Sequence, residues 1–208
     1  MRHFGLCIGL AGLVVLSAAL AYARPTPQLA NVTLENLETA FNGESNAHAR
    51  YLAFAQEADK EGYFQIASLF RAAAHAEEIH AKNHANEIKT LGGTPQAKID
   101  IPVVKTTKEN LEAAIKGETY ERDVMYPEFY KQARTAGIAG AVQTINYASA
   151  AEAEHAKLFT SALNNMATMR AKGVTYYVCT ICGYTTTNLD FAKCHTCYSP
   201  KEKYVAVT

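Results

Sequence analysis

The chain has 208 residues, 49% of them hydrophobic and 10% aromatic, which is enough for one main core and a small appendage. Twenty Lys and Arg residues balance twenty Asp and Glu residues, so no overall field attracts a polyanion. Because there is also no basic run, the composition argues against nucleic-acid binding. It is typical of neither a disordered nor a collagen-like chain.

Residues 1–23 have the features of a secretory signal peptide. Arg2 is their only charged side chain, residues 4–20 are apolar or small, and Ala21-Tyr22-Ala23 is a small-x-small cleavage site. We therefore predict cleavage after this site and export to the periplasm, without stable membrane insertion. The alternative is an uncleaved membrane anchor, since the uncharged run approaches the ~20 residues that span a bilayer.

Residues 31–171 show apolar side chains at spacings of three and four, as at Leu34, Leu37 and Phe41, which indicates amphipathic helices. The region is divided into four long helices by capping residues and helix breakers, which are Thr33, Gly62, Leu91 to Pro95, Thr107, Gly137 and Gly140. Residues 92–106 form the one long connection. Two helical hairpins joined by a long crossover are typical of the ferritin-like bundle, so we predict a mainly α protein with a ferritin-like four-helix bundle.

The two halves of this region look like a duplicated hairpin. The motif Glu-x-x-His-Ala-Lys occurs once in each half, beginning at Glu77 and at Glu152. A Gly-Glu pair precedes each motif, and its glutamates, Glu44 and Glu118, lie 33 and 34 residues upstream. Such agreement predicts a site between the halves with approximate twofold symmetry.

The glutamates and histidines of the repeat are the strongest functional signal in the bundle. Glu and His three residues apart on a helix point about 60° from each other, so both can approach one ion. One Glu from each of two helices, with Glu-x-x-His from each of the other two, is the pattern of di-iron carboxylate proteins. The two histidines are His80 and His155, and the glutamates are Glu44, Glu77, Glu118, Glu121 and Glu152.

Charge and burial support a di-metal site. Carboxylates on apolar helix faces are costly without a partner, and two ferrous or ferric ions would bring five of them close to neutrality. Oxygen ligands with some imidazole suit iron or manganese. The alternative is that these glutamates only solvate exposed helix faces, as most glutamates do.

Several neighbouring residues are weaker candidates. His48 and His84 each follow a predicted ligand by one helical turn, and Tyr51 and Tyr126 are placed to hydrogen-bond ligand carboxylates. Pro127 predicts a kink or a freed carbonyl in the third helix. Two further glutamates are predicted to lie on the surface: Glu78 and Glu154.

Residues 173–208 contain two Cys-x-x-Cys motifs separated by eleven residues: Cys179, Cys182, Cys194 and Cys197. This spacing presents four thiolates to one tetrahedral ion, either iron in a rubredoxin-like site or zinc in a ribbon. A segment this short builds little core, so we expect metal binding to supply its folding energy. In an exported protein, a pair of disulfides is the alternative.

These features together resemble the rubrerythrin family from about Leu34 to Val205. The resemblance rests on the segments Ala40 to Ser45, Glu77 to Lys82, Met125 to Pro127, Glu152 to Lys157, Cys179 to Tyr184 and the final Cys-x-x-Cys. It implies a ferritin-like domain with two irons and a C-terminal rubredoxin-like domain with one. The implied di-iron ligands are Glu44, Glu77, Glu118, Glu121, Glu152 and His155, with His80 replacing Glu121 at one iron in the reduced site.

The resemblance also implies a function. Family members mostly reduce hydrogen peroxide to water at the di-iron centre, with electrons relayed through the four-cysteine iron, and form head-to-tail homodimers. It makes Glu121 and His80 the catalytic residues, and the redox donor is unknown. His195 departs from the family, which usually has Pro after the third cysteine. The alternatives are a ferritin-like protein that oxidises or binds iron, and a zinc ribbon that binds a partner.

Overall fold

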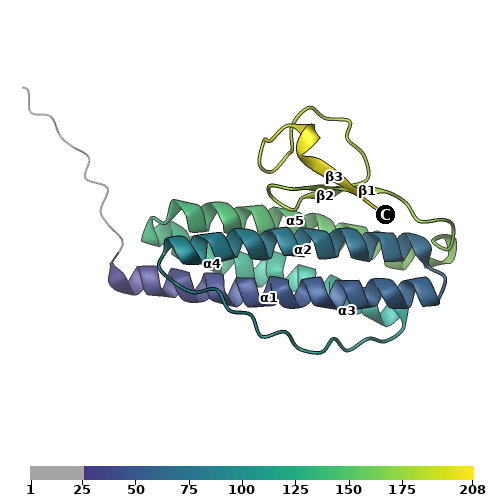
Figure 1. The fold of residues 1–208 in the computed structure, drawn as a ribbon, viewed down its shortest axis with the longest axis horizontal. Helices are drawn as coiled ribbons and strands as arrows, with labels where there is room; N and C mark the ends of the chain where they lie inside the picture. The colour runs from purple at the N-terminus through teal and green to yellow at the C-terminus, as the bar shows by residue number, and fades with distance from the viewer. Residues whose placement is uncertain (1–25) are drawn as a thin grey trace, which may run out of the picture.

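A bundle of long helices carries a small β module along one side (Figure 1). This is a computed structural model, and it describes residues 26–208. The predicted signal peptide at residues 1–23 therefore lies outside the described residues. Within residues 26–208, no helix combines the length and apolarity needed to cross a membrane.

The bundle has the predicted topology of two helical hairpins joined by a long crossover. Its helical segments are α1 (Pro27–Lys60), α2 (Phe64–Thr90), α3 (Thr107–Tyr120), the π-helical turn η1 (Glu121–Met125), α4 (Tyr126–Ala136) and α5 (Ala139–Asn164). The segments α3, η1 and α4 follow one another without a break and form the third long helix. Gly62 and Gly137, with φ of 77° and 69°, lie in the tight turns within the hairpins, where a left-handed conformation favours glycine.

Two predicted helix caps were wrong, the first by seven residues and the second by one. The first helix begins at Pro27, because the Thr26 side chain accepts a hydrogen bond from the Leu29 amide and proline suits the first helical position. Thr33 is buried inside this helix instead of capping it. The third begins one residue earlier than predicted, with Thr106 and Glu109 forming a capping box.

The predicted distortion near Pro127 is the π-helical turn that precedes it. The amide of Tyr126 donates to the carbonyl of Glu121, five residues back, instead of the usual four. Proline has no amide hydrogen to continue the normal pattern, and the extra residue in this turn lets the chain pass it within one continuous helix. The turn begins at Glu121, a predicted ligand, so it changes the direction in which this side chain leaves the helix.

The core consists of two apolar clusters separated along the bundle axis. One contains Phe54, Phe70 and Phe159, whereas the other contains Leu37 and Ile145. Between them, each long helix contributes buried polar side chains at the same level: Glu44, Glu77, His80, Glu118, Glu152 and His155. Apolar packing on both sides therefore seals a polar layer inside the bundle.

The C-terminal module is a three-stranded antiparallel sheet in the order β2-β1-β3. Its strands are β1 (Tyr176–Cys179), β2 (Thr185–Thr186) and β3 (Tyr204–Val207), and two short 3₁₀ turns lie before and within it, η2 (Met166–Thr168) and η3 (Lys201–Lys203). Figure 1 shows the module lying over α5 and α2. The guanidinium of Arg71 in α2 donates to the Thr208 carbonyl at 2.7 Å, which ties the end of the chain to the bundle.

Candidate metal centre

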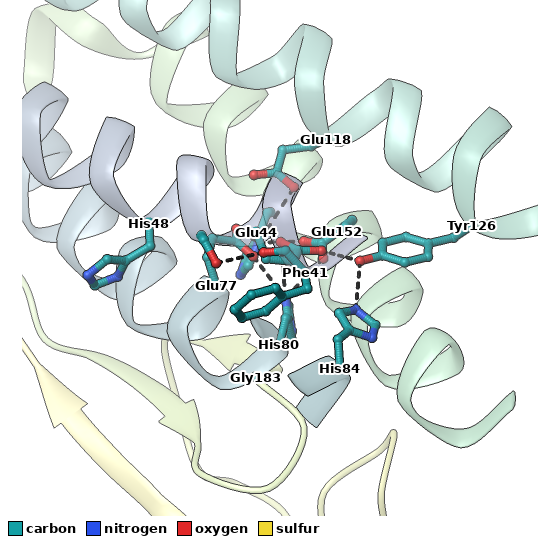
Figure 2. A network of polar contacts seen from close by, with 12 residues as sticks. Phe41, Glu44, His48, Glu77, His80, His84, Glu118, Tyr126, Glu152 and Gly183 are labelled. Carbon is teal, nitrogen blue, oxygen red and sulfur yellow. Dashed lines mark hydrogen bonds and ion pairs between the residues drawn. The ribbon is translucent and has the colours of Figure 1, made fainter. Parts of the chain in front are cut away.

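The buried layer contains two overlapping groups of possible metal ligands (Figure 2). One group contains Glu44 and His80, and the other contains Glu118 and His155; Glu77 and Glu152 belong to both. Within each group, the potential ligand atoms lie within 4.8 Å of one another. The six residues thus form two adjacent positions for metal ions that share two carboxylates.

Distances to the histidines show how the two carboxylates are shared. The Nδ1 atom of His80 lies 2.8 Å from Oε2 of Glu77 and 3.1 Å from Oε1 of Glu152. The Nδ1 atom of His155 lies 2.9 Å from Oε2 of Glu152 and 3.3 Å from Oε1 of Glu77. Each shared glutamate therefore offers one oxygen to each position, which is the arrangement of a bridging ligand.

The two tyrosines hydrogen-bond the unshared carboxylates, as the sequence suggested. Tyr51 donates to Oε1 of Glu118 at 2.5 Å, and Tyr126 donates to Oε1 of Glu44. Each tyrosine belongs to the opposite half of the repeat from its carboxylate. These contacts orient the carboxylates, so the remaining oxygen of each is directed at the cluster.

The donor set fits a pair of cations. One oxygen of each of the four buried glutamates has no hydrogen-bond partner: Glu44 Oε2, Glu77 Oε1, Glu118 Oε2 and Glu152 Oε1. These oxygens face only the Nδ1 atoms of His80 and His155, at 3.1 to 3.9 Å, and ion pairs from Lys or Arg to them are absent from residues 26–208. Two imidazoles are too few to balance four buried carboxylates, which is costly without further cations. Burial, followed by the nearby charge of Glu77, raises the pKa of Glu118 to about 8, so the cluster resists full ionisation until cations neutralise it.

Glu121 is the one predicted ligand that lies outside both groups. It lines a cavity of about 570 Å³ together with Arg50 and Asn46, at the side of the cluster. Burial and the charge of Glu44 raise its pKa, so it remains within electrostatic reach of the site. His80 occupies the cluster instead, which is the arrangement that the resemblance assigns to the reduced site.

The weaker candidates separate clearly in Figure 2. His48 points away from the cluster, and its Nδ1 pairs with the Ala74 carbonyl at 2.7 Å. His84 contacts Tyr126 and not the carboxylates. Glu78 is exposed as predicted, and Glu154 is partly buried and pairs with Lys157 on the surface.

The four cysteines of the module converge with their sulfur atoms within 4.8 Å of one another. All four are free, and the sulfur atoms of Cys179 and Cys197, like those of Cys182 and Cys194, lie 3.6 Å apart. The disulfide alternative is therefore not realised in this structure. Hydrogen bonding between the two side chains lowers the pKa of Cys179 to about 4 and raises the pKa of Cys182, so the first metal-binding thiolate forms at Cys179.

The module contacts both histidines of the bundle site on their outer side. Nε2 of His80 lies 3.1 Å from the Cys182 carbonyl oxygen, and Nε2 of His155 lies 3.1 Å from the Thr185 hydroxyl. Because each Nδ1 faces the carboxylates, each ring can bind metal through Nδ1 while Nε2–H donates to the module. A side chain at Gly183 would overlap the His80 ring, so glycine permits this close approach.

Sequence reasoning did not find this contact between the module and the bundle. Its acceptors are a backbone carbonyl and a threonine hydroxyl, and neither leaves a recognisable signal in one sequence. The resemblance led us to expect the cysteine site beside the di-iron site of the partner subunit in a dimer. In this structure, the chain's own module lies against its own bundle site.

The metal-free protein is expected to lose stability as the pH rises from about 4.5 to about 8. In this range, the unfolded chain releases the proton of Glu118 while the folded protein retains it, so folding becomes less favourable. Burial likewise raises the pKa of Glu44. Burial alone would lower the pKa of His80, but the Glu152 carboxylate raises it. Both raised pKa values also make folding less favourable as the pH rises.

Chemical unfolding of chelated and metal-loaded protein at several pH values would measure this effect. The metal-loaded protein should show a much weaker decline, because cations replace the protons. An equal decline in both forms would contradict the assignment of the layer as a cation site.

Comparison with known proteins identifies the family. The family model described as Rubrerythrin matches residues 35–163. Nigerythrin from Nitratidesulfovibrio vulgaris is 38% identical over 175 residues, covering 84% of this chain and 86% of that protein. Rubrerythrin-2 from Clostridium acetobutylicum is 36% identical, covering 84% of this chain and 96% of that protein.

A solved structure agrees with the sequence comparisons. Nigerythrin in its fully reduced, all-ferrous state superposes with a TM-score of 0.78 at 33% identity, covering 96% of this chain and 100% of that chain. In this family, the carboxylate and histidine cluster is a di-iron site and the four-cysteine cluster is a rubredoxin-like iron site, and both donor sets are present here. The chain belongs to the rubrerythrin family of di-iron oxidoreductases.

Proposed function

We propose that this protein reduces hydrogen peroxide to water at the bundle site, with electrons arriving through the four-cysteine iron. The observation that carries the proposal is the direct contact between the two sites, at the 3.1 Å approach of His80 Nε2 to the Cys182 carbonyl. This contact links a thiolate ligand of one site to an imidazole ligand of the other. The electron donor site and the place of reaction are therefore joined by directly contacting protein atoms.

The reaction takes up two electrons and two protons, H2O2 + 2 H⁺ + 2 e⁻ giving two H2O. A pair of irons held by the buried glutamates and histidines would supply the two electrons, one from each ion, so that no radical need be released. The protein holds the site in a dry layer, and Tyr51 and Tyr126 fix the carboxylates by donating hydrogen bonds to them. We expect Glu121 and His80 to exchange places as the oxidation state changes, because Glu121 lies beside the cluster that His80 occupies.

Anaerobic reduction followed by addition of peroxide tests the proposal. The colour of the oxidised four-cysteine iron should return much faster with peroxide than with air, because electrons leave it for the di-iron site. Reoxidation no faster than by air would refute peroxide reduction. The same preparation should contain three irons per chain; one zinc and two irons would break the proposed electron path, and many irons per assembly would favour iron storage.

A further inference from the structure

A line of hydrogen-bonded side chains runs from the bundle site toward the surface. Tyr126 donates its hydroxyl hydrogen to Oε1 of Glu44. Nε2 of His84 lies 3.1 Å from the Tyr126 hydroxyl, and the Thr144 hydroxyl lies 3.1 Å from Nδ1 of His84. Figure 2 shows the inner part of this line, with His84 beneath the Tyr126 hydroxyl and away from the carboxylates.

The outer end of the line reaches a surface cavity. Thr144 lines a cavity of about 200 Å³ between α2 and α5, together with Glu87, Gln143 and the exposed side chains of Asn86 and Thr90. Thr144 itself is 6% exposed, whereas His84 and Tyr126 are completely buried. The line therefore connects a place that water can enter with a carboxylate that water cannot reach directly.

The hydrogen bonds all point in one direction. Burial, followed by the charge of His80, lowers the pKa of His84 to about 3, so the ring is neutral and has one donor and one acceptor nitrogen. The Tyr126 hydrogen is used toward Glu44, so its oxygen accepts from Nε2–H of His84. Nδ1 of His84 then accepts from the Thr144 hydroxyl, and every donor in the line faces the metal site.

The other half of the repeat has a phenyl ring at the position that corresponds to His84. Phe159 follows His155 by four residues, as His84 follows His80. Tyr51 hydrogen-bonds Glu118, but its ring packs against Phe159 at 5.3 Å between centroids, where Tyr126 has His84 at 6.0 Å. A phenyl ring is therefore sufficient to pack against the tyrosine at this position. The imidazole of His84 adds two hydrogen bonds, one to Tyr126 and one to Thr144.

We propose that Thr144, His84 and Tyr126 form a proton wire that carries protons from the cavity to Glu44 at the bundle site. This inference deepens the proposed function, since it rests on a reaction that consumes two protons in a buried layer.

Each passage of one proton is balanced. Tyr126 gives its hydroxyl proton to the Glu44 carboxylate and receives the Nε2 proton of His84. Nδ1 of His84 receives the Thr144 proton, and Thr144 receives one from water in the cavity. The three wire residues therefore keep their charge, solvent neutralises the hydroxide left in the cavity, and one passage converts His84 from its Nε2–H to its Nδ1–H tautomer.

Replacement of His84 by glutamine separates proton transfer from positioning. A glutamine side chain has a donor and an acceptor for the same two partners, but its amide does not exchange protons as an imidazole does. Peroxide-driven oxidation of the reduced His84→Gln protein should be about 100-fold slower than in the wild type, within the range of positioned proton transfer. Its solvent deuterium isotope effect should rise, with three irons per chain retained.

Two variants extend the comparison. Thr144→Val cuts the outer link and should slow the reaction in the same way, whereas His48→Gln, at a histidine off the line, should react at the wild-type rate. If His84→Gln reacts at the wild-type rate while His84→Phe is slow, His84 only holds Tyr126 in place and the proton wire is refuted.

Neutron diffraction of the iron-loaded protein tests the wire without measuring activity. After a timed soak in D2O, deuterium should occupy Nε2 of His84 and the Tyr126 hydroxyl, with Nδ1 of His84 unprotonated. In the Thr144→Val protein, the Tyr126 hydroxyl should exchange more slowly than in the wild type. Equal exchange in the two proteins, or a proton on Nδ1 of His84, would overturn the proposal.

The two proposals fail in different ways. A wild-type protein that peroxide oxidises no faster than air refutes peroxide reduction, and the exchange pattern still decides whether the wire exists. Rapid wild-type oxidation with unimpaired His84 and Thr144 variants leaves the function standing and removes the wire.

Discussion

Replacing Glu77 with alanine is expected to remove both irons from the bundle. Its two oxygens face the two metal positions, so its loss opens both coordination shells at once. We expect the affinity for each iron to fall by more than the ~10–100-fold that is usual when a residue that only hydrogen-bonds a metal ligand is lost. Iron analysis should therefore give about one iron per chain, all of it bound by the cysteines.

Two matched variants make this result specific. Glu78→Ala changes the exposed neighbour on the same helix and should keep the wild-type iron content. Glu44→Ala removes a ligand of one position only, so it should weaken one iron more than the other. Equal iron loss in the Glu44 and Glu77 variants would contradict the bridging role of Glu77.

Replacing Cys182 with serine is expected to remove the four-cysteine iron and the ordered fold of the module. Structural metal sites of this size supply on the order of 10 kcal/mol of binding free energy, and the module buries few large side chains of its own. Loss of the iron should therefore unfold β1 to β3 while the bundle keeps two irons. Turnover of peroxide with an external electron donor should fall by about 100-fold or more, since every electron passes this site in the proposed path.

Thr180→Ser is the control for this variant. Thr180 lies in the same Cys-x-x-Cys motif, and its hydroxyl donates to the Lys203 carbonyl at 2.8 Å, which serine also allows. Iron content, visible absorption and amide hydrogen exchange of residues 176–207 would report the outcome. Full turnover in the Cys182→Ser protein would show that electrons reach the bundle without the module.

The helical part of the fold was predictable because its signals are local. Apolar spacing, the glycines in the turns and each Glu-x-x-His motif depend only on residues a few positions apart, and they indicated four helices and the six residues of the buried cluster. The errors at Thr33 and Thr107 have a simple cause. Several threonines near a helix start can act as caps, and the choice depends on whether the preceding turn also folds, as it does after Thr26.

The roles within the site were less accessible from the sequence. The spacing placed Glu77 and Glu44 near one ion, but it did not distinguish a shared carboxylate from an unshared one. That distinction follows from how far each helix is rotated and shifted against its neighbours. The position of Glu121 outside the cluster was likewise not predictable, because this residue begins a π-helical turn, which a sequence pattern of normal helical period does not reveal.

The sequence by itself predicted the buried glutamates, histidines and cysteines that come together in the two clusters, with Glu121 as the one predicted ligand left outside, because burying so many such groups without cations is costly. Only the tertiary structure decided what those side chains touch on their outer side. The contact of His80 with the Cys182 carbonyl and the line from Glu44 through His84 to Thr144 join segments that are far apart in the chain. Such contacts arise from packing between elements, and packing is not encoded in the spacing of residues along any one helix.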